Sequence, residues 1–279
     1  MILPQGFQFS QGSLQDFADC RRRFQLRYLL RQSWPAVPSE PVLELEGTMQ
    51  QGARFHRIVQ QHLLGLPVER LTPMAQEDDL SRWWQNYLHF SQGGGLEALT
   101  GPGARRYPEI TLSAPLGAHR LLAKLDLLAV TSQGGALILD WKTARKRPRR
   151  QWLADRLQTR IYPFLLVQAG ATLNGGTPFL PEQVEMVYWF ADFPDQPERF
   201  PYSASAYQAD QDYLAEIVAT VQQLAENDFA LTNDIRHCAY CVYRSLCDRG
   251  GKAGALDEFD ALDEAAPLLD FEQITEIEF

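Results

Sequence analysis

The sequence has few cysteines and no long hydrophobic run. Its 279 residues include only four cysteines, whereas small secreted domains are cross-linked by many. A chain of this length buries roughly 70–75% of its unfolded surface and can build a core without disulfides, so we interpret the cysteines as metal ligands or buried thiols. No apolar stretch reaches the roughly 18 residues of a membrane span. The first residues lack the basic and apolar pattern of a secretory signal, so we expect none. We therefore expect a cytoplasmic protein that has no membrane partner.

Basic residues are absent from the C-terminal segment. Residues 253–279 contain nine acidic and no basic side chains, so the net charge of −9 arises in this segment. The rest of the chain is neutral, and the acidic total does not exclude a nucleic-acid partner, because the local field decides binding. The tail alternates acids with Leu, Phe and Ile, a composition typical of disordered or partner-docking segments. We therefore expect one folded domain over residues 1–252, followed by an acidic tail that covers a basic groove or recruits another protein.

Hydrophobic periodicity predicts an α/β fold. A turn signal at Gly134-Gly135 joins two apolar strands, 119–130 and 136–142, into a hairpin. Helical spacing of apolar residues and alternating patterns define the other elements. The expected helices cover part of 7–31, then about 45–64, 76–99, 151–169 and 205–227, and the remaining strands cover 107–115 and 183–193. This order predicts a small central sheet flanked by helices, with a helical N-terminal part and a cysteine-rich loop at 237–249.

Charged side chains interrupt the apolar hairpin. Asp140 and Lys142 end its second strand and share one face, because side chains alternate along a strand. Asp126 lies within its first strand and meets Asp140 if the strands pair. Two converging carboxylates repel each other, and a bound cation relieves that repulsion. Oxygen ligands suit Mg²⁺ or Mn²⁺, and a nearby lysine can orient water and stabilise developing phosphate charge. This set suits metal-assisted phosphodiester hydrolysis, although an isolated D-x-K pair is more often a solvated salt bridge.

The surrounding motifs resemble the RecB-like branch of the PD-(D/E)XK nuclease superfamily. The resemblance rests on Gly52-x-x-x-His56, on Leu125-Asp126, on Ile138-Leu139-Asp140-Trp141-Lys142-Thr143 and on Gln158-x-x-x-Tyr162, which occur in this order. It implies a metal-dependent DNA nuclease with a restriction-endonuclease-like core and a mixed sheet. By this resemblance His56, Asp126 and Asp140 are metal ligands and Lys142 is the catalytic lysine. Gln158 and Tyr162 would position the lysine or DNA, and Glu109 is an additional acid.

The cysteines form a second motif. Cys238-x-x-Cys241-x5-Cys247 lies near the C-terminus, and Cys20 lies far upstream. Four thiolates suit tetrahedral Zn²⁺ or a [4Fe–4S] cluster, and spacing alone does not choose between them. The arrangement resembles the iron–sulfur nucleases of the same branch, which include CRISPR-associated adaptation nucleases and helicase–nuclease end-processing enzymes. The resemblance implies a structural [4Fe–4S] cluster that joins the two ends of the domain, with Zn²⁺ as the alternative.

A basic run follows the hairpin and predicts contact with DNA. It comprises Arg145, Lys146, Arg147, Arg149 and Arg150, and such residues bind phosphates without reading sequence. We expect an exonuclease that acts on DNA ends or single strands in repair or recombination. Because the chain has no G-x-x-x-x-G-K-[ST] motif, unwinding would need a helicase or another repair protein as partner. The alternatives are a non-catalytic DNA-binding or helicase-accessory subunit, and a zinc-stabilised interaction module.

Overall fold

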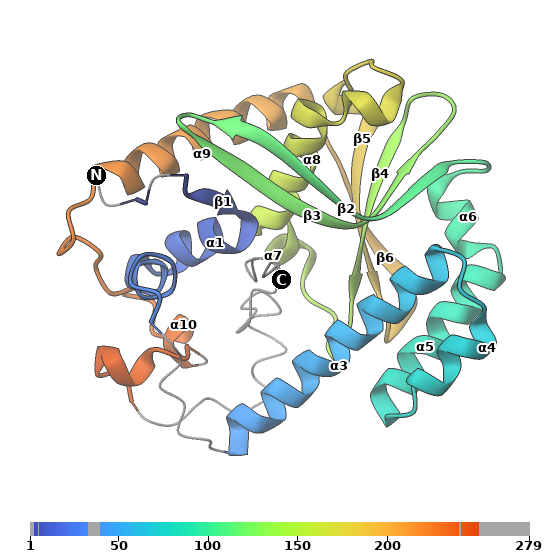
Figure 1. Cartoon of the computed structure of the whole chain (residues 1–279), viewed down its shortest axis with the longest axis horizontal. Helices are drawn as coiled ribbons and strands as arrows, with labels where there is room; N and C mark the ends of the chain where they lie inside the picture. The colour runs from blue at the N-terminus through green and yellow to red at the C-terminus, as the bar shows by residue number, and fades with distance from the viewer. Residues whose placement is uncertain (1–2, 5, 33–39, 240, 251–279) are drawn as a thin grey trace, which may run out of the picture. The chain divides into compact units, whose positions relative to one another are not determined.

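The computed structural model of the chain describes residues 3–4, 6–32, 40–239 and 241–250 (Figure 1). The acidic tail predicted for 253–279 lies outside these residues. None of the helices in the described part of the chain is long and apolar enough to cross a membrane. The described residues are α/β in class, as the sequence predicts.

A mixed sheet organises the chain. Its strands follow the order β1-β3-β4-β5-β6, and β2 pairs with β3. β4 is antiparallel to β3 and parallel to β5, and β5 is antiparallel to β6. The strand bounds are β1 Gln8–Ser10, β2 Arg105–Leu116, β3 His119–Val130, β4 Ala136–Lys142, β5 Val184–Phe190 and β6 Phe193–Pro201. The parallel pair needs a crossover, which the helices between β4 and β5 provide.

The contacts divide the chain into two compact units. The terminal unit comprises residues 1–48, 115–121 and 213–279, and the central unit comprises 49–114 and 122–212. β3 begins in the first unit and continues in the second. The helices are α1 Gln11–Asp19, α2 Arg21–Phe24, α3 Glu40–Leu63, α4 Val68–Leu71, α5 Asp78–Gln92, α6 Gly95–Thr100, α7 Arg150–Asp155, α8 Leu157–Ala169, α9 Ala204–Gln223 and α10 Arg236–Ala239.

An aromatic cluster holds the terminal unit together. Phe24 packs edge-on against Phe7 and Phe17 and is stacked on Phe229, with ring centroids 6.3 Å apart in the stacked pair. Ser10 caps the start of α1: its hydroxyl accepts a hydrogen bond from the Ser13 N–H, and the Ser13 hydroxyl accepts one from the Ser10 N–H. This reciprocal cap satisfies two N–H groups that the helix itself leaves open. Residues from both ends of the chain thus share one small core.

The two faces of the sheet in the central unit carry different side chains. Trp141 of β4 and Trp189 of β5 are buried with Phe55 of α3 and Trp83 of α5 in one apolar cluster. The alternation of side chains turns the intervening residues Asp140 and Lys142 to the opposite face, where α8 packs against β5 (Figure 1). The polar residues of the hairpin therefore face α8, and the large aromatic residues face α3 and α5.

Most predicted elements are present, and the differences are local. The strands 119–130 and 136–142 have the predicted bounds and pair as the predicted hairpin. The helix predicted for 151–169 is interrupted at Arg156, whose backbone is extended, and the helix predicted for 76–99 is divided before Gly95. β6 was not predicted, because prolines at 194, 197 and 201 disfavour a strand. It forms at one end of the sheet order, where its other side needs no partner strand.

Candidate active site and cysteine pocket

The hairpin brings the two predicted aspartates to neighbouring strands. Leu127 of β3 pairs with Leu139 of β4, so Asp126 and Asp140 follow at the adjacent positions. The Asp126 Oδ2 accepts a hydrogen bond of 2.9 Å from the Trp141 N–H, which ties the first carboxylate to the strand that carries the second. The sequence interpretation of a shared carboxylate site is consistent with this register.

A histidine and a second carboxylate join Asp126. The His56 Nδ1 on α3 lies 3.2 Å from the Asp126 Oδ2. One ligand atom from each of His56, Glu109 and Asp126 lies within 4.8 Å of the others. Glu109 sits on β2 with a φ of 53°, a strained value for a residue with a side chain. Backbone strain of this kind at a strand residue near a site changes the direction of its side chain. Glu109 also forms an ion pair with Lys124 at 2.5 Å.

Asp140, Lys142 and Gln158 form a closed polar triangle beside this group. The Lys142 Nζ lies 2.9 Å from the Asp140 Oδ2 and donates to the Gln158 Oε1 at 3.1 Å. The Gln158 Nε2 donates to the Asp140 Oδ1 at 2.5 Å. Gln158 belongs to α8, and Tyr162 is buried one turn later on the same helix. The α8 glutamine therefore fixes both the acid and the lysine of the predicted D-x-K motif.

The carboxylates titrate differently because their neighbours differ. Burial raises the pKa of Asp140 to about 6, against the lowering effect of Lys142. Burial also acts on Asp126, but the His56 imidazolium outweighs it and lowers the pKa of that carboxyl. Burial opposes protonation of His56, yet Asp126 outweighs it and raises the imidazole pKa to about 9. Opposite displacement of two neighbouring acids is a feature of functional sites.

The glycine of the G-x-x-x-H motif has a steric role. A Cβ placed on Gly52 would lie 3.1 Å from the Thr143 Oγ1, closer than an ordinary van der Waals contact. A side chain at position 52 would therefore require Thr143 or α3 to shift by a few tenths of an ångström. The glycine of the G-x-x-x-H motif on α3 therefore lies next to Thr143, the residue that follows Lys142 in the D-x-K-T motif.

The predicted DNA-binding run is largely engaged in ion pairs. Arg145 pairs with Asp79 at 2.7 Å, and Arg147 and Arg150 both pair with Glu198, the latter at 2.6 Å. Arg149 and Lys146 are exposed. Their assignment to DNA remains a prediction, and the charges of Arg145, Arg147 and Arg150 are offset by acidic partners.

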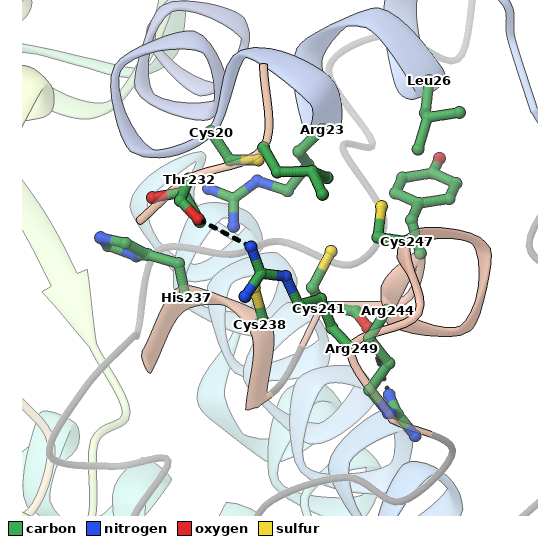
Figure 2. Close-up of a pocket in the computed structure, with 12 residues that line it drawn as sticks. Cys20, Arg23, Leu26, Thr232, His237, Cys238, Cys241, Arg244, Cys247 and Arg249 are labelled. Carbon is green, nitrogen blue, oxygen red and sulfur yellow. Dashed lines mark hydrogen bonds between the residues drawn. The ribbon is translucent and has the colours of Figure 1, made fainter. Parts of the chain in front are cut away.

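The four cysteines of the terminal unit line one pocket. Figure 2 shows the sulphur atoms of Cys20, Cys238, Cys241 and Cys247 directed toward a common space. Cys20 follows α1, Cys238 lies on α10, Cys241 follows α10, and Cys247 ends the 3-10 helix Arg244–Cys247. All four are free thiols and are half-buried. The structure thus brings the upstream cysteine to the C-terminal motif, as the resemblance implies.

Positive side chains surround the thiols. Arg23, Arg244 and Arg249 line the same pocket, and Arg249 donates to the Thr232 carbonyl at 3.3 Å (Figure 2). Burial raises the pKa of Cys241 to about 11 and raises that of Cys238 and Cys247. These three thiols are therefore protonated near neutral pH, and any metal group must displace those protons.

The chain matches a known protein family over most of its length. The family model of the PD-(D/E)XK nuclease superfamily matches residues 8–248, and the chain belongs to this superfamily. No curated protein matches the sequence. Among solved structures, the chain is similar to SSO0001, with 11% identity, 88% of each chain covered and a TM-score of 0.41. It is also similar to a structure named "Putative exonuclease" from Eubacterium rectale, with 11% identity, 82% of this chain and 87% of the other covered, and a TM-score of 0.48.

Proposed function

We propose that the protein is a metal-dependent deoxyribonuclease that hydrolyses phosphodiester bonds at DNA ends or in single strands, in repair or recombination. The observation that carries the proposal is the convergence of two acids, an imidazole and an ammonium group at the end of one hairpin. The sequence resemblance to the RecB-like branch supports exonuclease action. A helicase or another repair protein would be its partner for duplex substrates.

The donor atoms fit Mg²⁺ or Mn²⁺. The ligand group His56, Glu109 and Asp126 offers one imidazole nitrogen and two carboxylates, which suits Mn²⁺ as well as Mg²⁺. The Asp140 Oδ2 is buried and lies 2.9 Å from the Lys142 ammonium. Carboxylate oxygens are the ligands that these ions prefer, so Asp140 would be a further ligand beside this group. When bound, the ion would polarise the scissile phosphate and lower the pKa of an attacking water.

The side chains around this site would orient the reactants. Lys142 is held by Asp140 and Gln158, so its ammonium would bind the scissile phosphate and stabilise the charge that develops on it. Gln158 would keep the lysine and the acid at a fixed separation. Arg149 and Lys146, which are exposed just after β4, would contact the backbone of the DNA without reading its sequence.

End-labelled single- and double-stranded DNA tests the proposal, with and without Mn²⁺. We expect metal-dependent cleavage by the wild type and its loss in Asp140→Asn and Lys142→Met. Asp210→Asn is the matched control, because Asp210 is equally buried, at 4% exposure, but pairs with Arg160. Full cleavage by Asp140→Asn would refute the site. An inactive wild type that still binds DNA would favour the non-catalytic accessory subunit.

The four-cysteine pocket fits a [4Fe–4S] cluster, which we propose as a structural cofactor. All four cysteines line this one pocket together with Arg23, Arg244 and Arg249. Four thiolates suit a cluster as well as Zn²⁺, and the nearby arginines would offset the negative charge of a cluster. When bound, the cluster would cross-link Cys20 to the C-terminal motif.

Anaerobic purification tests the cluster. We expect a brown protein with equal amounts of iron and acid-labile sulfide, and loss of both in Cys241→Ser. Ser245→Ala is the control, since Ser245 lies on the same cysteine-rich segment and is exposed. Stoichiometric zinc without sulfide would instead identify the site as a zinc centre.

A further inference from the structure

A tyrosine outside every predicted motif forms part of the surroundings of Lys142. The Lys142 Nζ lies over the ring of Tyr188 on β5, 5.3 Å from the ring centroid. β4 and β5 run parallel with Asp140 opposite Tyr188, so the acid, the lysine and the ring lie on one face of the sheet. Lys142 is therefore bounded by a carboxylate, an amide oxygen and the face of an aromatic ring.

The ring of Tyr188 is held in place at both its hydroxyl end and its edge. The Thr159 hydroxyl donates to the Leu153 carbonyl at 2.5 Å and lies 2.7 Å from the Tyr188 hydroxyl. Because Thr159 has one hydroxyl proton, the Tyr188 O–H is the donor in this contact. Phe200 packs edge-on against the ring, with centroids 5.9 Å apart. Burial raises the pKa of Tyr188, so the ring stays neutral and its hydroxyl stays a donor.

We propose that Tyr188 is a positioning residue that holds the Lys142 ammonium over its ring, in the place where Lys142 acts on the phosphate. This inference rests on the proposed nuclease function of Lys142. The negative face of an aromatic ring attracts an ammonium group, most strongly where water is excluded. The side chain of Lys142 is 18% exposed and Tyr188 is fully buried, so the contact is largely dry. The ring removes one direction of motion that the hydrogen bonds to Asp140 and Gln158 leave open.

A buried tyrosine in β5 ordinarily serves only to pack the core. Two substitutions distinguish core packing from the positioning of Lys142. Tyr188→Phe keeps the ring face and loses only the hydroxyl bond to Thr159. Tyr188→Leu fills part of the same space but removes the ring face. Tyr202→Leu is the matched control, because Tyr202 is also buried and its hydroxyl donates to Asp210 at 2.8 Å.

The first measurement is independent of catalysis. The sequence has only four lysines, so lysine labelled with ¹³C at Cε gives few signals in an NMR spectrum, and Lys142→Arg identifies one of them. The ring current should shift the Lys142 signal upfield of the other three in the wild type and in Tyr188→Phe. The shift should vanish in Tyr188→Leu and persist in Tyr202→Leu. An unshifted Lys142 signal in the folded wild type would overturn the proposal.

The second measurement uses DNA cleavage with Mn²⁺. Misplacement of a catalytic group by about 1 Å costs up to roughly a hundredfold in rate. We expect Tyr188→Leu to lower kcat about tenfold or more with KM unchanged, and Tyr188→Phe to restore most of it. Equal losses in both variants would overturn the role of the ring face. If the wild type does not cleave DNA, the nuclease proposal fails, and the NMR shift still decides whether Tyr188 positions Lys142.

Discussion

Single side chains determine whether the D-x-K pair is a surface salt bridge or a reactive site. An exposed pair of this kind contributes little, because water screens it. Here the acid is 4% exposed, and its amide partner comes from a different helix. A buried acid and base with a fixed separation keep their geometry without reorganisation during a reaction. Burial and the glutamine, rather than the motif itself, therefore give the pair its chemical significance.

Gln158→Ala should lower cleavage about ten- to a hundredfold, because residues that orient ligands and bases typically contribute that much. The substitution removes the donor to Asp140 and the acceptor for Lys142. The control is Gln168→Ala on the same helix, whose amide contacts the Tyr207 hydroxyl at an exposed position. We would measure kcat with Mn²⁺ for both variants. Equal activity of the two would show that the triangle has no role in the reaction.

Gly52→Ala should fail to stabilise α3. Alanine is favoured over glycine in a helix by about 1 kcal/mol, but the added Cβ would meet the Thr143 Oγ1 at 3.1 Å. In a Thr143→Ala background the same change should raise the free energy of unfolding by about 1 kcal/mol. Gly47→Ala, in the same helix with open space around it, should give that gain in the wild type. Urea unfolding gives the free energy of unfolding of Gly52→Ala, of Gly52→Ala combined with Thr143→Ala, and of Gly47→Ala. If Gly52→Ala raises the free energy of unfolding without the Thr143→Ala change, the steric role is excluded.

The residues that form the site were largely predictable, because each is part of a short motif with a fixed spacing. Glu109 was the weakest prediction, since its part in the site depends on a positive φ that no residue pattern encodes. Tyr188 was missed because it reads as one more apolar residue in a buried strand. Only the register between β4 and β5 places its ring beside Lys142.

At the scale of elements, periodicity predicted strands better than helix ends. A strand bounded by a glycine turn has sharp limits, and β3 and β4 match their predicted bounds. The break at Arg156 has no glycine or proline at that position, and β6 contains three prolines. Ion pairing between elements was also hidden from the sequence: Asp79 of α5 and Glu198 of β6 neutralise arginines that the sequence suggested for DNA.

The packing of α3 on α5 predicts an acid-sensitive stability. Burial lowers the pKa of His62, whose Nδ1 lies 3.0 Å from the Tyr87 hydroxyl. Below a pH of about 6.5 the unfolded chain therefore takes up a proton that the folded state resists. The free energy of unfolding should fall as the pH decreases below that value and level off below the folded pKa. His62→Gln should flatten this part of the profile, measured by urea unfolding at several pH values.

The control for loss of an imidazole is His89→Gln, at an exposed position of α5. It should retain the wild-type dependence over the same pH range. A profile that is unchanged in His62→Gln would show that another group governs acid sensitivity in this unit.

At the scale of the whole molecule, the two ends of the chain meet in the terminal unit through hydrogen bonds between distant segments. Gln25 donates to the Glu226 carbonyl at 2.6 Å, and the Arg22 N–H donates to the Ala230 carbonyl at 3.2 Å. A hydrogen bond contributes only about 1 kcal/mol net. Because the sequence separation exceeds 200 residues, bringing these segments together is entropically costly. A bound group held by Cys20 and the C-terminal cysteines would offset that cost.

Cys20→Ser should therefore destabilise the terminal unit selectively. By analogy with a native cross-link over a long loop, the loss should be about 2–5 kcal/mol. Hydrogen exchange should show reduced protection in α1, α2 and the segment from 227 to 250, while β4, β5 and α8 keep theirs. Wild-type protein from which the metal group has been removed should show the same pattern, and Ser245→Ala should not. Unchanged protection in Cys20→Ser would mean that the aromatic core and the hydrogen bonds join the two ends without the cysteines, and that the cysteines have no structural role.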